Sequence, residues 1–168
     1  MNTLEFEKAD TKEKIKQLAD TADEIWHEYF TCILSESQID YMVDKFQSEK
    51  AVTEQIANKN YSYFLVRLGG IIIGYVGISP EEETKRLFLS KFYLKKNARG
   101  RGYASQMFSF IFDIAKSRGL TSVYLTVNKH NDHSIAVYEH MGFCKVKAQV
   151  TDIGNGFVMD DFVMEKVL

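Results

Sequence analysis

The segment from Leu94 to Ala104 reads Leu-Lys-Lys-Asn-Ala-Arg-Gly-Arg-Gly-Tyr-Ala and combines two glycines with four basic side chains. An apolar run precedes it and a helical pattern follows it, so it is expected to connect a strand to the start of a helix. At such a turn the free backbone N–H groups and the helix dipole attract an anion, and glycine lets a phosphate approach the backbone closely. The segment therefore predicts a site for a ligand that carries phosphate.

The two glycines of this turn, Gly100 and Gly102, are a weak signal when taken alone, because many helices begin after glycine. The turn lacks the Gly-x-x-x-x-Gly-Lys-Ser/Thr spacing of a P-loop and does not complete a Gly-x-Gly-x-x-Gly motif. Clusters of basic side chains often mark only a solvated surface. A plain solvated connection therefore remains the alternative to an anion site.

A second segment that could do chemistry spans residues 128–143, Asn-Lys-His-Asn-Asp-His-Ser-Ile-Ala-Val-Tyr-Glu-His-Met-Gly-Phe. Asn131 or Asp132 can cap a short helix here, because either side chain can accept a hydrogen bond from the first free amides. Tyr138 would lie on the apolar side of that helix. Tyrosine is commonly buried with its hydroxyl paired, so a structural and a functional role both remain open for Tyr138.

Metal binding and covalent catalysis are the other chemistries that the residue types allow. His130, His133 and His140 are clustered, but their spacing fits no compact zinc pattern, so no metal is predicted. Cys32 and Cys144 are isolated and are expected to be reduced thiols of a cytoplasmic protein. Cys144 is expected to be buried, inert packing rather than a nucleophile that carries an acyl group.

The chain has 168 residues, a length that favours one domain over residues 1–168. Its net charge of −2 and pI near 6.1 argue against a nucleic-acid partner. No apolar run approaches the roughly 20 residues of a membrane span. The first residues, Met1–Glu7, have neither the basic region nor the apolar stretch of a secretory signal. The sequence therefore predicts a cytoplasmic protein without a membrane partner.

Hydrophobic periodicity and turn residues give the expected order of elements. Asp10-Thr11 and Ser35 can cap the first two helices, and Gly69-Gly70 is a hairpin turn. The expected strands span residues 4–7, 61–67, 71–78, 86–94, 122–127, 143–151 and 157–167. The expected helices span residues 12–30, 36–46, 50–58, 103–118 and 133–140.

The strand–helix–strand unit at residues 86–127 should form a right-handed parallel crossover, while the flanking hairpins are antiparallel. The order therefore predicts an α/β (α+β) fold. We expect a mixed, mostly antiparallel central sheet of about seven strands with one parallel crossover and helices on both faces.

The two polar segments together resemble the GNAT superfamily of N-acetyltransferases. Residues 99–104, Arg-Gly-Arg-Gly-Tyr-Ala, fit the pattern Gln/Arg-x-x-Gly-x-Gly/Ala that marks acetyl-coenzyme A binding in this family. Asn131 and the run from Ala136 to Phe143 resemble the family's later Asn…Ala-x-Tyr-x-x-x-Gly-Phe segment. The order of elements also matches, so the resemblance covers nearly the whole chain. Residues 154–166 are also similar to bacterial polyamine acetyltransferases.

The resemblance implies which residues bind coenzyme A. The backbone of residues 92–94 would pair with the pantetheine arm like an added strand, which requires strand 86–94 to splay from strand 122–127. The turn amides would hold the pyrophosphate, with Lys95, Lys96, Arg99 and Arg101 adding charge around it. The implied cofactor residues are Phe92, Tyr93, Leu94, Arg99, Gly100, Arg101, Gly102, Tyr103, Ala104, Asn131, Ser134 and Tyr138.

The implied reaction moves an acetyl group from acetyl-coenzyme A to a primary amine by direct attack through a tetrahedral intermediate. A main-chain amide near Leu94 would stabilise the oxyanion, and Tyr138 would protonate the leaving thiolate. A base must also remove a proton from the ammonium form of the acceptor. Ser90 and Lys91 stand where some relatives place a glutamate, so a water chain or a carboxylate from elsewhere would serve.

The expected acceptor is a small-molecule amine, with a polyamine as the narrower form of this prediction. Candidate acceptor residues are Trp26, Tyr29, Phe30 and Tyr75, although the first three lie on an apolar helical stripe that is usually core. Two alternatives remain open: a non-catalytic acyl-coenzyme A sensor and a peptide or protein N-acetyltransferase. The final strand could also pair across a homodimer.

Overall fold

The computed structural model describes residues 3–168, which form two compact units. Unit 1 contains the residues through Ser79 together with Ser90–Phe110, and unit 2 contains Pro80–Leu89 together with Ile111–Leu168. Met1 and Asn2, which belong to the expected domain over residues 1–168, lie outside the described residues. The single-domain organisation stays a prediction.

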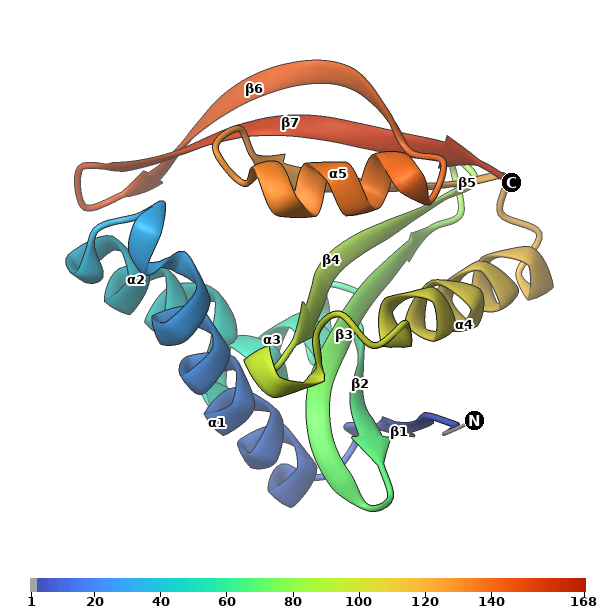
Figure 1. The fold of residues 1–168 in the computed structure, drawn as a ribbon, viewed down its shortest axis with the longest axis horizontal. Helices are drawn as coiled ribbons and strands as arrows, with labels where there is room; N and C mark the ends of the chain where they lie inside the picture. Colours follow the sequence, from blue (N-terminus) through green and yellow to red (C-terminus); the bar gives the residue numbers. More distant parts are fainter. Residues whose placement is uncertain (1–2) are drawn as a thin grey trace. The chain divides into compact units, whose positions relative to one another are not determined.

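Seven strands form a sheet in the order β1-β2-β3-β4-β5-β7-β6 (Figure 1). The pair β4–β5 is parallel, whereas β1–β2, β2–β3, β5–β7 and β6–β7 are antiparallel. This order confirms the expected mixed sheet with one parallel crossover. The strands are β1 (Glu5–Lys8), β2 (Ser62–Leu68), β3 (Ile71–Glu81), β4 (Arg86–Leu94), β5 (Ser122–Asn128), β6 (Cys144–Gly154) and β7 (Phe157–Val167).

Five α-helices begin close to where the sequence predicts them. Thr11 and Ser35 accept hydrogen bonds from the amides of Lys14 and Gln38, which confirms both expected caps. Asn131, rather than Asp132, caps the last helix. The helices are α1 (Lys12–Tyr29), α2 (Glu36–Met42), α3 (Glu49–Asn58), α4 (Tyr103–Ser117) and α5 (Asp132–His140), with 3₁₀ turns at Phe30–Cys32 and Lys96–Ala98 and a π-turn at Val43–Gln47.

Unit 1 buries side chains on both faces of its strands, because successive strand residues point to opposite sides. On one face, β2 and β3 pack against α1 and α3 through a core of Ala9, Leu18, Ala22, Ile25, Val52, Tyr63, Leu65 and Tyr75. On the other face, the ring of Phe110 from α4 stacks on Phe6 with centroids 4.0 Å apart and meets Phe64 edge-on at 5.0 Å. Helices therefore cover both faces of the unit 1 strands, as expected.

In unit 2, β5 and β6 pair with β7, and Phe143 packs against both Phe112 and Tyr138. The strand β6 ends the sheet order, and most of its residues are exposed. Cys144 is the first residue of β6 and is exposed, so the expectation of a buried cysteine is wrong. An edge strand has fewer neighbours to cover its side chains, which explains the difference.

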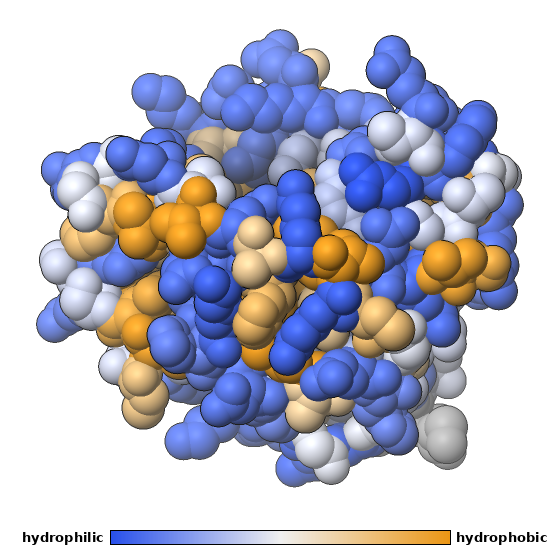
Figure 2. All heavy atoms as spheres, turned by 90° about the horizontal axis from the view of Figure 1, so that it is seen from above, coloured by the Kyte–Doolittle hydropathy of each residue, from blue (hydrophilic) through white to orange (hydrophobic). Residues whose placement is uncertain are grey.

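The surface is mainly polar. Figure 2 shows one face on which apolar side chains lie in small groups between hydrophilic ones. Large exposed apolar residues include Ile71, Val146, Val150, Val158 and Val167. Within residues 3–168, no helix has the length and apolar character needed to span a membrane.

Candidate functional site

The glycine turn joins β4 to α4 as the sequence predicts. The Lys95 amide donates to the carbonyl of Ile73 at 2.8 Å, and a 3₁₀ turn follows. Gly100 and Gly102 have φ values of +73° and +82°, a region that non-glycine residues enter only with strain. A Cβ on either glycine would meet no heavy atom within 4 Å. The turn therefore leaves open space beside the first amides of α4, which suits an anion.

The strand β4 extends past its pairing with β5. The parallel register runs from Arg86–Ser122 to Phe88–Tyr124, whereas β4 continues to Leu94. Residues 92–94, which are expected to pair with the pantetheine arm, lie beyond the end of this register. The expected splay and the pairing of residues 92–94 with a pantetheine arm stay predictions.

The opposite edge of β4 is held closely by β3. A Cβ on Gly74 would lie 2.2 Å from the carbonyl oxygen of Tyr93 and 3.2 Å from Cα of Leu94. Only glycine allows the two backbones to approach this closely. Gly74 therefore determines where the backbone of residues 93–94 lies.

Two of the four basic side chains of the turn are paired with α1. The Arg99 guanidinium lies 3.5 Å from a Glu28 carboxylate oxygen and 4.8 Å from the centroid of the Tyr29 ring. Its Nε also donates to the carbonyl of Leu94 at 3.0 Å. Lys95 forms an ion pair with Glu24 at 3.0 Å. Both side chains thus contact α1 in this structure, and their expected role around a phosphate stays a prediction.

The other basic side chains of the turn, Lys96 and Arg101, are exposed. They are the turn cations that reach solvent most fully. Through its contacts, Arg99 connects the turn and the end of β4 to α1.

In unit 2, the predicted cofactor residues share one face of α5. Asn131 is buried, and its side-chain oxygen accepts from the Ser134 amide at 3.3 Å. Tyr138 is 9% exposed and its ring lies 6.0 Å from that of Phe143. The spacing i, i+3 and i+7 places the three side chains on the same side of the helix. Their contacts with a cofactor stay predictions.

Three of the four candidate acceptor residues lie in the core. Trp26 and Phe30 are 5% exposed and Tyr75 is fully buried. Trp26 Nε1 donates to the Tyr75 hydroxyl at 3.2 Å, and that hydroxyl donates to Gln47 Oε1 at 3.0 Å. Burial raises the pKa of Tyr75 well above its usual range, so the phenol stays neutral. Tyr29 is only partly buried. The substrate role of all four residues stays a prediction.

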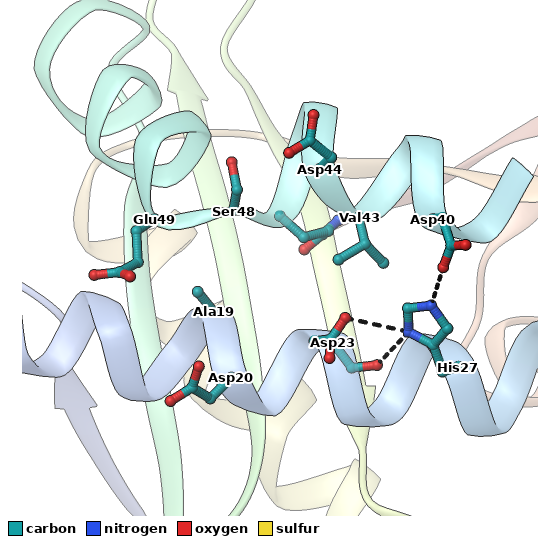
Figure 3. A pocket seen from close by; sticks show the side chains of 10 residues that line it. Ala19, Asp20, Asp23, His27, Asp40, Val43, Asp44, Ser48 and Glu49 are labelled. Atoms are coloured by element: carbon teal, nitrogen blue, oxygen red, sulfur yellow. Dashed lines mark hydrogen bonds and ion pairs between the residues drawn. The ribbon is translucent and has the colours of Figure 1, made fainter. Parts of the chain in front are cut away.

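An acidic pocket of about 310 Å³ lies between α1 and the segment from α2 to α3 (Figure 3). His27 hydrogen-bonds through Nε2 to the Asp40 carboxylate and through Nδ1 to the Asp23 carbonyl, and these contacts raise its pKa. The imidazole thus connects α1 to α2. The lining residues are Ala19, Asp20, Asp23, His27, Asp40, Val43, Asp44, Gln47, Ser48 and Glu49.

This pocket was not predicted from the sequence. Asp20, Asp23 and His27 are spaced i, i+3 and i+7, so a helical projection of α1 could have placed them on one face. The carboxylates of the facing segment come together with them only through tertiary packing. Within residues 3–168, no group of three or more His, Cys, Asp or Glu side chains could hold a metal ion.

A buried lysine on β4 was also missed. Lys91 is 8% exposed, and its Nζ donates to Ser90 Oγ at 2.7 Å. Burial lowers the pKa of Lys91 to about 7. Leu87, Leu89 and Lys91 alternate as buried residues along β4, but residues 87–91 show no such alternation of apolar and polar types in the sequence.

Comparison with known sequences shows which family shares these features. Residues 19–143 match the model of the "Acetyltransferase (GNAT) family". The chain is 28% identical over 109 residues to "Probable N-acetyltransferase family 8 member 5" of Mus musculus, over 62% of this chain and 48% of that protein. It is 29% identical over 119 residues to "Probable spermine N(1)-acetyltransferase" of Bacillus subtilis subsp. natto, over 66% and 75%. The chain spans about half the length of the mouse protein and of several other curated relatives.

Solved structures share the fold. The PaiA N-acetyltransferase from Thermoplasma acidophilum, solved in complex with coenzyme A, has a TM-score of 0.79 at 20% identity, over 99% of both chains. A chimera of spermidine N-acetyltransferase SpeG from Vibrio cholerae has a TM-score of 0.71 at 19% identity, over 99% of this chain and 95% of the other. Residues 19–143, which match the family model, contain β4, the glycine turn and α5. The chain therefore belongs to the acetyltransferase (GNAT) family.

Proposed function

We propose that this chain is an acetyl-coenzyme A-dependent N-acetyltransferase. The observation that carries the proposal is the turn between β4 and α4, where Gly100 and Gly102 adopt positive φ and open space adjoins the first helix amides. The turn lies inside the region that matches the family. An anion fits there, because helix N-termini present free N–H groups and partial positive charge.

The residues of this chain would bind the cofactor, stabilise the oxyanion and transfer a proton. The turn amides, through Ala104, would bind the pyrophosphate, and residues 92–94 would align the pantetheine arm. Bound acetyl-coenzyme A supplies an activated thioester carbonyl. The Leu94 amide would donate a hydrogen bond to the carbonyl oxygen as charge develops there. Tyr138 would donate its proton to the leaving sulfur, and Asn131 and Ser134 would bind the cofactor from the same face of α5.

The acceptor that we propose is a small primary amine, with a polyamine as the narrower proposal. The relative named as a probable spermine acetyltransferase supports this acceptor. The acidic lining of the pocket on α1 also supports it, because a carboxylate-rich surface attracts cationic amines. The cytoplasmic location and the homodimer stay predictions.

Acetyl-coenzyme A is expected to raise the thermal midpoint of unfolding by several degrees, because a ligand that binds only the folded state stabilises it. Amines are then expected to release free thiol, which a colorimetric thiol assay measures. The panel should contain spermidine, spermine, simple monoamines and short peptides. No thermal shift at millimolar cofactor would contradict the proposal. A shift without turnover on any amine would favour an acyl-coenzyme A sensor, and turnover on peptides alone would favour a peptide N-acetyltransferase.

Gly102→Ala is expected to weaken coenzyme A binding by about tenfold or more, since a side chain there enters the space beside the helix amides. The positive φ should also cost about 1 kcal/mol of stability. Gly119→Ala is a matched control, because Gly119 has φ +70° and open space at the other end of α4. Calorimetric titration measures the affinity. Equal losses of coenzyme A affinity in both variants would show that the turn does not hold the phosphates.

A further inference from the structure

Lys91 is a buried amine without a counter-charge. It lies on the face of β4 that also buries Leu87 and Leu89, and only 8% of its surface is exposed. Within residues 3–168 it forms no ion pair with a carboxylate. A buried ammonium without a partner is costly, so its neutral form is favoured. Such a lysine can accept a proton near neutral pH, unlike a solvated one.

The surroundings of Lys91 leave space for its stem and provide hydroxyl groups but no acid. A Cβ on Gly77 of β3 would lie 2.9 Å from Lys91 Cγ, so glycine makes room for the side chain. From β2, the rings of Tyr61 and Tyr63 lie 5.5 Å and 5.9 Å from Nζ. Burial raises the pKa of Tyr63, so this phenol stays neutral at ordinary pH. The faces of these rings favour an ammonium, whereas burial opposes it and lowers the pKa of Lys91.

A chain of hydrogen bonds connects this amine to a less buried position. Lys91 Nζ lies 2.7 Å from Ser90 Oγ, which also accepts from the Tyr61 hydroxyl at 3.2 Å. Ser90 and Tyr61 are only partly buried. A serine hydroxyl can donate to the neutral amine while it accepts from another donor. Ser90 can therefore pass a proton between Lys91 and a group outside the core.

We propose that neutral Lys91 accepts, through the hydroxyl of Ser90 and intervening water, the proton that the acceptor ammonium must lose before attack. This inference rests on the proposed acetyltransferase function. The strand β4 carries no carboxylate, and no other group on it offers a proton acceptor of this kind. Ser90 and Leu94 are four residues apart, so they lie on one face of β4 and about 13 Å apart along it. An acceptor nitrogen beside Leu94 would therefore reach Ser90 through a chain of several waters rather than through a single one.

The protons balance in this scheme. The ammonium N–H bond breaks, Ser90 takes that proton and its own proton passes to the lone pair of Lys91. The amine lone pair then forms the C–N bond, and the C–S bond breaks. The sulfur takes the proton of Tyr138, which is replaced by the second proton that the nitrogen loses. Lys91 returns one proton to solvent, so each turnover releases one amide, one thiol and one proton.

The decisive test is the pH profile of turnover for wild type and three variants, from about pH 5.5 to about pH 9.5. Wild-type kcat should fall as the pH drops through the pKa of Lys91, about 7, because protonated Lys91 cannot accept a proton. Lys91→Met should lower kcat by about 30-fold at neutral pH. It should also shift the acidic limb of the kcat profile toward the pKa of the free acceptor amine. Lys91→Arg should behave similarly, since arginine keeps its proton. The kcat of Ser90→Ala should lie between those of these variants and wild type.

Lys50→Met is a matched control, because Lys50 of α3 is exposed. Lys91→Met should keep coenzyme A affinity and should unfold at no lower temperature than wild type, since it removes a buried unpaired amine. These readouts separate proton transfer from a structural role. Wild-type kcat and an unchanged pH limb in Lys91→Met would overturn the proposal.

A second measurement does not depend on turnover. Acetic anhydride labelling with mass spectrometry should show half-maximal reactivity of Lys91 near pH 7, whereas free Nα-acetyl-lysine, added as a standard, should react half-maximally near about pH 10.4. If Lys91 instead follows this standard, the proposed base is wrong even when the enzyme acetylates amines. If Lys91 titrates as expected but no amine is acetylated, the failure lies with the proposed function.

Discussion

Replacing Gly74 with alanine is expected to lower the free energy of unfolding by about 3 kcal/mol. The new Cβ would lie 2.2 Å from the carbonyl oxygen of Tyr93 and 3.2 Å from Cα of Leu94. Both are backbone atoms, so no rotamer change can relieve the contact and the strand itself must move. A hydrogen bond between Lys95 and Ile73 holds the strand at this point. Urea denaturation followed by circular dichroism measures the loss.

The same variant is expected to bind coenzyme A at least about tenfold more weakly, because residues 92–94 must keep their position to pair with the pantetheine arm. Gly77→Ala is the matched control on the same strand. There the nearest atoms, Tyr63 Cε1 at 2.7 Å and Lys91 Cγ at 2.9 Å, belong to side chains and not to the backbone of residues 92–94. Gly77→Ala should therefore cost less stability and leave cofactor affinity close to wild type. Equal losses of affinity in the two variants would contradict this role of Gly74.

Tyr138→Phe is expected to lower kcat by about 100-fold while coenzyme A affinity stays close to that of wild type. The change removes only the hydroxyl, which the proposed reaction uses to protonate the leaving sulfur. The ring remains in its buried position beside Phe143, so the fold should be kept. Steady-state thiol release gives kcat and KM, and calorimetric titration gives the affinity.

Tyr41→Phe is the control for loss of a tyrosine hydroxyl, because Tyr41 lies on α2 and is not placed in the proposed reaction. Its kinetics should match wild type. An unchanged kcat in Tyr138→Phe would mean that another group protonates the sulfur. A change in KM alone would assign Tyr138 to binding rather than to proton transfer.

The sequence predicted the elements that carry the candidate cofactor site because their signals are local. The glycine turn follows a strand pattern and precedes a helix pattern, and both sets of residues lie within a short stretch of chain. The caps formed by Thr11, Ser35 and Asn131 were also readable, since a capping side chain bonds an amide three residues away.

The features that were missed depend on partners far away in the chain. Glu28 meets Arg99 only after folding brings α1 to the turn, and no spacing rule connects residues so far apart. The exposure of Cys144 follows from the place of β6 at the end of the sheet order, which the sequence does not state. The burial of Lys91 was also hidden, because residues 87–91 are three apolar residues followed by two polar ones and show no alternation in the sequence.

The contacts of Arg99 connect donor binding with the position of α1, and the proposed reaction must coordinate these two events. One guanidinium holds the carbonyl of Leu94, the carboxylate of Glu28 and the ring of Tyr29. A donor phosphate that attracted this guanidinium would weaken its contacts with α1, the helix that carries two candidate acceptor residues, Trp26 and Tyr29. By thermodynamic reciprocity, an acceptor that repositions α1 must change the affinity for the donor by the same factor. The affinities for the two substrates would then be coupled through a single guanidinium.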